Sequence, residues 1–148
     1  MAVFGSDETP QAQWLHLIVE AESQAGYLLS HEIKKYLMLT LDYYINDLTL
    51  PTSIIAIDYL NALNQKGTKQ SVGLRNIGDQ CLILSGLFPE RLLKKNVPLD
   101  YTISIGRQSY SHLAIEKPYH PWDNNLFQEL HVHFMGLVDI LHFMRAPR

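Results

Sequence analysis

The amino-acid sequence predicts an all-α protein, a single-domain bundle of five or six helices. Apolar residues recur at steps of three and four through most of the chain, which is the period of a helix buried on one face. No segment shows the alternation of apolar and polar residues that is typical of a strand. With 148 residues, 47% of them hydrophobic and 18% charged, the chain can bury one core without a disulfide or a metal.

The first helices are predicted to follow a flexible leader. Residues 1–13 are polar, and we therefore assign the helical domain to residues 14–148. The segment WLHLIVEAE, which starts at Trp14, is predicted to be helical because of the glutamate and alanine residues at its end. A longer helix over residues 24–48 carries one broad apolar stripe, and Pro51 ends it.

Two further helices are predicted in the middle of the chain. Thr52 or Ser53 caps the first of them, and Gly67 ends it in a left-handed conformation. Thr68 caps the second helix, which Gly86 terminates. One face of this second helix carries Leu74, Ile77, Gly78, Cys81, Leu82 and Ser85.

Three elements are predicted in the C-terminal part. Pro89 begins a short helix over residues 90–95, because a proline in the first turn lacks only an N–H that has no partner there. Asp100 caps the next helix. A last helix over residues 122–145 follows a proline-rich break and carries basic Arg145 near its end, as the helix dipole favours.

Small residues on two of these helices predict close helix packing. Gly78, Cys81 and Ser85 form one groove of small side chains, and Gly106 and Ser109 form a second. Glycine inside a helix costs about 0.5 to 1 kcal/mol relative to alanine, so its presence there needs a local reason. We expect this reason to be the close approach of a neighbouring helix.

Asp79 lies next to the apolar stripe, in the middle of the segment from Gly73 to Arg91. Arg75 precedes it by four residues, which allows an intrahelical ion pair. The carboxylate is equally placed to accept hydrogen bonds from donors at the start of a neighbouring helix. The sequence leaves both interpretations open, and Asp79 is the residue of this segment with the strongest claim to a function.

The same segment resembles a family of uncharacterised bacterial proteins that share the pattern G-D-x-x-L-x-x-S-G-x-F-P-E followed by a tyrosine-rich G-x-x-x-Y helix. The matching positions are Gly78, Asp79, Leu82, Ser85, Gly86, Phe88, Pro89 and Glu90, and then Tyr101, Gly106, Tyr110 and Leu113. Thr102 stands where the family pattern has a second consecutive tyrosine. The resemblance implies a helical fold and a bacterial origin, and it implies no activity.

Composition and charge favour some partners over others. The net charge is −3 and the basic residues are scattered, so we expect no binding to nucleic acid. The longest apolar stretch is half a membrane span, so we expect no membrane insertion. The one cysteine, Cys81, lies among leucines and isoleucines, which predicts a buried thiol and fits a cytoplasmic protein. No cofactor motif is present, and no cofactor is expected.

The segment SHEIKKYL resembles the phosphoacceptor box of sensor histidine kinases, in which a helical histidine is followed by glutamate and a basic residue. The resemblance assigns His31 as the phosphoacceptor, Glu32 as the group that orients its imidazole, and Lys34 as the cation that meets the phosphoryl group. Lys35 and Tyr36 stand where that family has Thr-Pro. The alternative interpretation is an ordinary charged helix surface.

The histidines near the C-terminus suggest a metal site. On a continuous helix His131 and His133 lie about 200° apart and do not face one ion. Two pairs remain as ligand candidates: Glu129 with His133, and Asp139 with His142. The second pair has the carboxylate-x-x-His spacing of di-iron bundles, but the sequence holds no second copy of it.

These observations predict a non-enzymatic helical protein with an interaction or regulatory accessory role, which binds a protein partner or forms a homodimer through an apolar helix face. The alternatives are a phosphotransfer acceptor that uses His31 and a bundle that binds a metal or small ligand. Several tyrosines either line a ligand cavity between helices or place their rings in the core. These tyrosines are Tyr36, Tyr43, Tyr44, Tyr59, Tyr101 and Tyr110.

Overall fold

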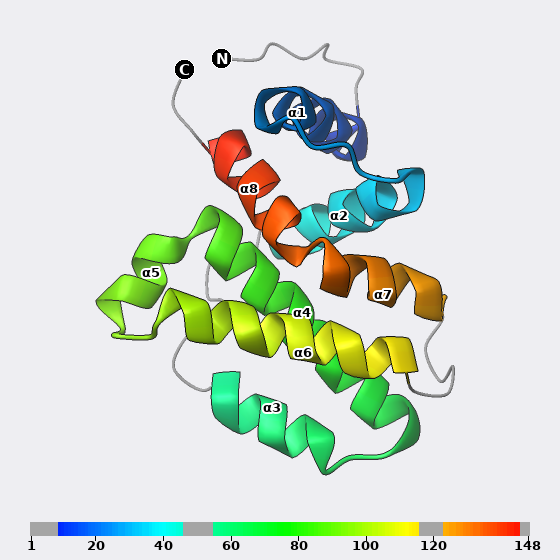
Figure 1. Ribbon diagram of the computed structural model, residues 1–148, viewed down its shortest axis with the longest axis vertical. Coiled ribbons are helices and arrows are strands. Elements are labelled where there is room, and N and C mark those ends of the chain that lie inside the picture. Colours follow the sequence, from blue (N-terminus) through cyan, green and yellow to red (C-terminus); the bar gives the residue numbers. More distant parts are fainter. Residues whose placement is uncertain (1–8, 46–54, 116–122, 146–148) are drawn as a thin grey trace.

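The computed structural model describes residues 9–45, 55–115 and 123–145. They form eight helices, which are α1 (Pro10–Ala25), α2 (His31–Tyr44), α3 (Ile55–Leu63), α4 (Gly67–Leu87), α5 (Pro89–Lys94), α6 (Leu99–Ile115), α7 (Asn124–Val132) and α8 (Phe134–Arg145) (Figure 1). No strand occurs in these three ranges. The all-α class is therefore confirmed, while the predicted number of five or six helices is too low.

The first two helices differ from their predicted limits. Helix α1 begins at Pro10, inside the predicted leader, because the Thr9 side chain caps it by accepting a hydrogen bond from the backbone N–H of Ala12 at 3.1 Å. It ends at Gly26, whose φ of 66° is left-handed. The predicted helix over residues 24–48 starts only at His31, where the Ser30 side chain caps α2. The predicted cap at Thr52 or Ser53 lies outside the described residues.

The predicted helix over residues 122–145 is two helices. Asp123 caps α7 by accepting a hydrogen bond from the backbone N–H of Asn125 at 3.0 Å. The chain then breaks at His133, whose Nδ1 is hydrogen-bonded to the hydroxyl of Tyr27. Gly136, in the first turn of α8, packs so closely on the same tyrosine that a Cβ there would overlap its ring. A contact from the α1–α2 connection thus fixes the position of the break.

Three predicted helix ends also differ. Helix α4 begins at Gly67, whose φ is +60°, and the predicted cap Thr68 lies inside its first turn. It continues one residue past Gly86, because the backbone N–H of Phe88 still bonds to the carbonyl oxygen of Leu84. Asp100 lies in the first turn of α6 instead of preceding it. Pro89 begins α5, and this prediction is confirmed.

Helix α4 lies at the centre of the fold and packs against α2, α3, α5, α6 and α8 (Figure 1). The face predicted to be apolar is the buried one, since Leu74, Ile77, Gly78, Cys81, Leu82 and Ser85 are all buried. Aromatic rings from α6, α7 and α8 complete the core around it, and Tyr110, Phe127 and Phe134 are fully buried. In the described part of the chain, no helix has the length and apolar character needed to cross a membrane.

A buried glutamate holds the connection between α1 and α2. Glu22 is 4% exposed, and its Oε2 accepts a hydrogen bond from the backbone N–H of Leu29 at 2.7 Å. Its Oε1 lies 3.3 Å from Nζ of Lys34 on α2. One carboxylate therefore satisfies a buried backbone donor and a cation, and it joins the end of α1 to the first turns of α2.

We expect Glu22→Ala to lower the free energy of unfolding by about 2 to 3 kcal/mol, because a buried N–H and a partly buried ammonium group lose their acceptor. Urea unfolding measures this change. Glu32→Ala is the matched control on the exposed first turn of α2, and we expect it to change stability by less than about 0.5 kcal/mol. Equal effects of the two substitutions would contradict this role of Glu22.

Candidate functional site

Two glycines allow α4 and α6 to approach each other closely. A Cβ at Gly78 would lie 2.6 Å from Cε1 of Tyr110, so the ring rests directly on the backbone of α4. On the facing helix, a Cβ at Gly106 would lie 2.8 Å from Cβ of Cys81 and 2.6 Å from Cζ of Phe134. Each helix thus presents a glycine to a side chain of the other, and the prediction of close packing at both positions is confirmed.

The end of the G-D-x-x-L-x-x-S-G-x-F-P-E motif also contributes to helix packing. A Cβ at Gly86 would lie 2.5 Å from Cβ of Leu141, so this glycine admits α8. Pro89 begins α5, and Glu90 is exposed, with Oε2 at 3.3 Å from an Nη atom of Arg145. These residues fix the turn from α4 into α5 and the position at which α8 packs. None of them lines the pocket described below.

Ser85 is buried on α4, and its hydroxyl has no hydrogen-bond partner within the described residues. An unsatisfied buried hydroxyl is destabilising, because folding removes its water without replacing it. We expect Ser85→Ala to raise the free energy of unfolding by about 1 kcal/mol. Thermal and urea unfolding measure the change. Ser109→Ala is the control, since that hydroxyl donates to the carbonyl oxygen of Ile105 at 2.9 Å, and a gain there as well would refute the explanation.

Asp79 is the buried charge of the fold's central helix. Its Oδ1 accepts two hydrogen bonds of 2.7 Å, one from the hydroxyl of Tyr36 on α2 and one from the hydroxyl of Tyr110 on α6. Neither predicted partner is the one observed. The donors are side-chain hydroxyls of two other helices, not the backbone at a helix start, and in the described ranges Asp79 makes no ion pair with Arg75.

Burial dominates the electrostatics of this group. Removal from water raises the pKa of Asp79 to about 6, against the lowering effects of the two tyrosine hydroxyls and the nearby Arg75 charge. Burial, together with the charge of Asp79, raises the pKa values of Tyr36 and Tyr110 far above their ordinary range. Near neutral pH the site therefore holds a carboxylate and two protonated hydroxyls that donate to it.

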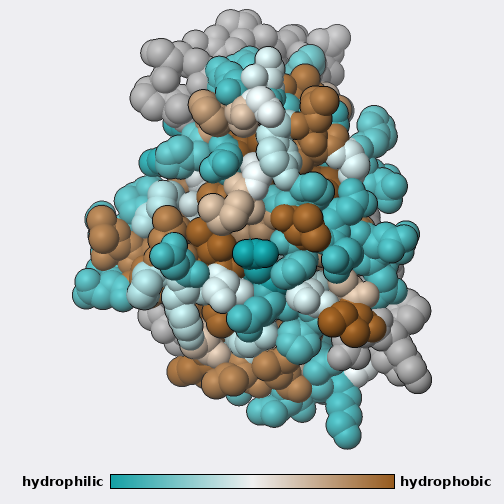
Figure 2. All heavy atoms as spheres, in the orientation of Figure 1, coloured by the Kyte–Doolittle hydropathy of each residue, from teal (hydrophilic) through white to brown (hydrophobic). Residues whose placement is uncertain are grey.

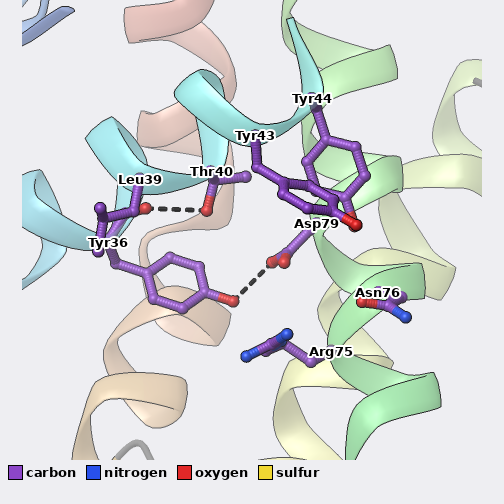
Figure 3. A pocket seen from close by; sticks show the side chains of 8 residues that line it. All are labelled: Tyr36, Leu39, Thr40, Tyr43, Tyr44, Arg75, Asn76 and Asp79. Atoms are coloured by element: carbon purple, nitrogen blue, oxygen red, sulfur yellow. Dashed lines mark hydrogen bonds between the residues drawn. The ribbon is translucent and has the colours of Figure 1, made fainter. Parts of the chain in front are cut away.

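One side of Asp79 opens into a pocket of about 220 Å³ between α2 and α4 (Figure 3). Its lining consists of Tyr36, Leu39, Thr40, Tyr43, Tyr44, Arg75, Asn76 and Asp79. Figure 3 shows Asp79 and Tyr36 pointing toward one another from α4 and α2, with Arg75 extending from α4 toward Tyr36. The pocket combines aromatic walls with one acidic and one basic group.

Two hydrogen-bonding atoms at this pocket are unused by the described part of the chain. Both tyrosine hydroxyls bond to Oδ1 of Asp79, which leaves Oδ2 of the carboxylate with its acceptor capacity. Arg75 is half-buried, and its Nε is a buried donor without a hydrogen-bond partner. The pocket thus has a carboxylate acceptor and a guanidinium in its lining, within aromatic walls that also favour a cation.

Sequence reasoning identified Asp79 but not its partners. Of the tyrosines, Tyr36, Tyr43 and Tyr44 line the pocket, while Tyr110 reaches Asp79 from the core side. The ligand-cavity interpretation thus fits the three tyrosines that line the pocket, and the core interpretation fits Tyr110. The available signal was an aspartate at the edge of an apolar stripe, which requires buried donors, and tyrosines on the apolar stripes of two other helices, which supply them.

The histidine-kinase-like segment lies at the start of α2. His31 and Glu32 are exposed, as a phosphoacceptor and its neighbour would be. Lys34, however, is tied to the buried Glu22 at 3.3 Å and is not available to meet a phosphoryl group at His31. The cation of the predicted set thus already has a carboxylate partner, and phosphotransfer at His31 stays a prediction.

The metal candidates lie around the break between α7 and α8. Nδ1 of His133 is already hydrogen-bonded to the hydroxyl of Tyr27, and its backbone N–H bonds to the carbonyl oxygen of Glu129 at 2.8 Å. Asp139 and His142 are exposed on α8. Within residues 9–45, 55–115 and 123–145, no three His, Cys, Asp or Glu side chains are grouped so that they could hold a metal ion.

Comparisons with protein-family models, with curated proteins and with solved structures give no match to this chain. The geometry of the α2–α4 pocket and the surface of the bundle are therefore the guides to function.

Proposed function

We propose that the protein is a non-enzymatic accessory domain that binds a small zwitterionic molecule in the α2–α4 pocket. The observation that carries this proposal is the buried charge of Asp79 beside the unpaired Nε donor of Arg75. We place the protein in the reducing cytoplasm of a bacterium, because its one cysteine is a buried free thiol and because of the motif resemblance at Gly78 to Glu90.

The charge of Asp79 is not needed to satisfy the two tyrosines. An asparagine oxygen in the place of Oδ1 would accept the same two hydrogen bonds without the desolvation of a carboxylate. A group that is buried, ionised near neutral pH and destabilising to the fold is a candidate for a binding role. An ammonium group at Oδ2 supplies the compensating charge, and the aromatic rings of Tyr36 and Tyr43 favour it further.

Arg75 defines the other end of the ligand. Its guanidinium lines the pocket and is always charged, so a carboxylate bound there gains charge-assisted hydrogen bonds from it. The pocket of about 220 Å³ is smaller than the roughly 300 to 1,000 Å³ typical of sites for drug-sized ligands. The ligand is therefore of amino-acid size, with an ammonium group near Asp79 and a carboxylate near Arg75.

The hydroxyls at the pocket support binding and not nucleophilic attack. Those of Tyr36 and Tyr110 keep their protons, because burial and the charge of Asp79 raise their pKa values. The hydroxyl of Thr40 donates to the backbone carbonyl oxygen of Tyr36 at 2.8 Å (Figure 3). Each of these hydroxyls donates its one proton to an acceptor within the protein, and none is prepared as a nucleophile.

Calorimetry with a panel of free amino acids and their amides tests the proposal. We expect at least one free amino acid to bind and its C-terminal amide to bind at least tenfold more weakly. Arg75→Gln should abolish this difference, while Arg107→Gln on the exposed face of α6 should leave it unchanged. The proposal fails if no member of the panel binds, or if Arg75→Gln leaves the preference for the carboxylate intact.

The apolar surface of α3 supports self-association as a second part of the proposal. Ile57 and Leu60 are 58% and 59% exposed, and Figure 2 shows hydrophobic surface gathered over α3 at the lower edge of the view. A matching face on a second copy would cover both side chains in a two-fold symmetric dimer. We expect sedimentation equilibrium to give a dimer that Leu60→Glu converts to a monomer. A chain that stays monomeric at millimolar concentration contradicts self-association.

A further inference from the structure

A second concave surface lies between α1 and α2. This groove encloses about 350 Å³ and is lined by Leu15 and Val19 of α1 and by His31, Lys34, Lys35 and Met38 of α2. It shares no lining residue with the Asp79 pocket. Occupancy of this groove therefore does not depend on the proposed ligand or on self-association through α3.

The floor of the groove is apolar and accessible. Leu15 and Val19 are one helical turn apart on α1 and are 39% and 49% exposed, and the half-buried Met38 faces them from α2. A furrow between two packed helices takes the side-chain ridge of a third helix. Methionine adapts its shape to such a partner because its side chain is unbranched and flexible.

The rim of the groove carries unbalanced positive charge. Lys34 is neutralised by Glu22, at 3.3 Å. Lys35 is exposed and has no ion pair in the described part of the chain, and His31 beside it is exposed as well. An apolar floor with a cationic edge is complementary to a segment that has apolar side chains on one face and carboxylates beside them.

We propose that this groove docks an amphipathic helix of a partner protein, with leucine-like side chains at helical spacing on the floor and a glutamate or aspartate paired with Lys35. A lipid surface fits less well, because membrane recognition uses clusters of about four to eight basic residues and this groove offers one unpaired lysine. The concave shape also suits a helix ridge better than a flat bilayer surface.

Site-specific photo-crosslinking in cells of the source organism tests this docking. The full chain carries benzoylphenylalanine in place of Val19, and the same group at exposed Val132 on α7 serves as the position control. We expect a crosslink from position 19 alone, to a peptide whose sequence has helical apolar spacing and flanking carboxylates. Lys35→Glu should reduce the yield of this adduct at least tenfold while the thermal unfolding midpoint stays unchanged.

Exchanging the two charges between Lys35 and the captured segment then tests whether these groups form an ion pair. Replacing the carboxylate of the captured segment with lysine should restore the adduct in the Lys35→Glu variant, and a synthetic peptide of the segment should gain helical circular dichroism when it binds. Adducts with lipid, with a second copy of this chain or with a segment lacking carboxylates overturn the proposal. It is equally overturned if no adduct forms, or if Lys35→Glu leaves the yield intact.

Discussion

Replacing Asp79 with asparagine is expected to stabilise the protein by about 3 kcal/mol at pH 8 and to change its stability by less than about 1 kcal/mol at pH 4. The reason is the raised pKa of this carboxyl group, about 6 in the folded protein, against about 3.9 in an unfolded chain. Because the folded state binds this proton more tightly than the unfolded chain does, protonation of Asp79 stabilises the fold, and the stabilisation is complete below pH 4. That contribution is lost as the pH rises through 6.

Urea unfolding at several pH values from 4 to 8 measures this effect. The wild-type curve should fall between pH 4 and 6 relative to that of Asp79→Asn, and the two should run parallel above pH 7. Asp139→Asn on the exposed face of α8 is the matched control and should follow the wild type at every pH. If Asp79→Asn is less stable than the wild type at pH 8, the carboxylate charge serves the fold itself.

The same variant separates stability from binding. Asparagine keeps an oxygen for the hydroxyls of Tyr36 and Tyr110 but presents a neutral group at the position of Oδ2. We therefore expect a more stable protein whose affinity for the zwitterionic ligand is at least tenfold lower. A gain in stability with a loss of binding is the pattern expected of a residue held for function.

The second large effect is expected at Gly78. Gly78→Ala places a Cβ 2.6 Å from Cε1 of Tyr110, so the ring must move or α6 must shift away from α4. Overpacking of this kind costs about 1 to 3 kcal/mol, and the better helix propensity of alanine offsets about 1 kcal/mol. Loss of the Tyr110 hydrogen bond to Asp79 adds about 1 kcal/mol. The net expectation is a loss of about 2 kcal/mol, measured by urea unfolding.

Gly73→Ala on the same helix is the matched control. Its Cβ would lie 3.2 Å from Cβ of Ala62, a small side chain near the end of α3, so we expect a change of less than about 1 kcal/mol. A carbon-detected NMR titration gives a second measurement, since moving Tyr110 should raise the pKa of Asp79 in Gly78→Ala only. Equal losses at Gly73 and Gly78 would mean that contact with the ring is not the cause.

Periodicity in the sequence predicted where helical segments lie better than where they end. The apolar stripe from residue 24 onward hid the turn at Gly26, because Leu28 and Leu29 continue the spacing through a non-helical connection. The last helix was predicted as continuous because its break depends on Tyr27, which lies 106 residues away from His133. Local spacing contains no information about a contact of that range.

The candidate site was predictable in part for a similar reason. The position of Asp79 beside small and apolar residues marked it as a residue with buried surroundings. Its donors come from positions 43 and 31 residues away, Tyr36 and Tyr110, and only the packing of α2 and α6 against α4 brings them to one oxygen atom. The composition of the pocket followed from that packing and not from any local motif.

The sharing of Oδ1 between two tyrosines bears on how the fold opens. Helix α2 packs on α4 much less extensively than α6 does, so α2 is the easier of the two to detach. When Tyr36 withdraws with α2, water reaches Asp79 and the carboxylate regains the hydration that folding removed. Detachment of α2 is therefore promoted once the carboxyl is ionised, and amide hydrogen exchange in α2 rises with pH beyond its intrinsic chemical dependence. The ionisation of Asp79 in this way sets the population of a partly open state in which α2, one wall of the pocket, has moved away from α4.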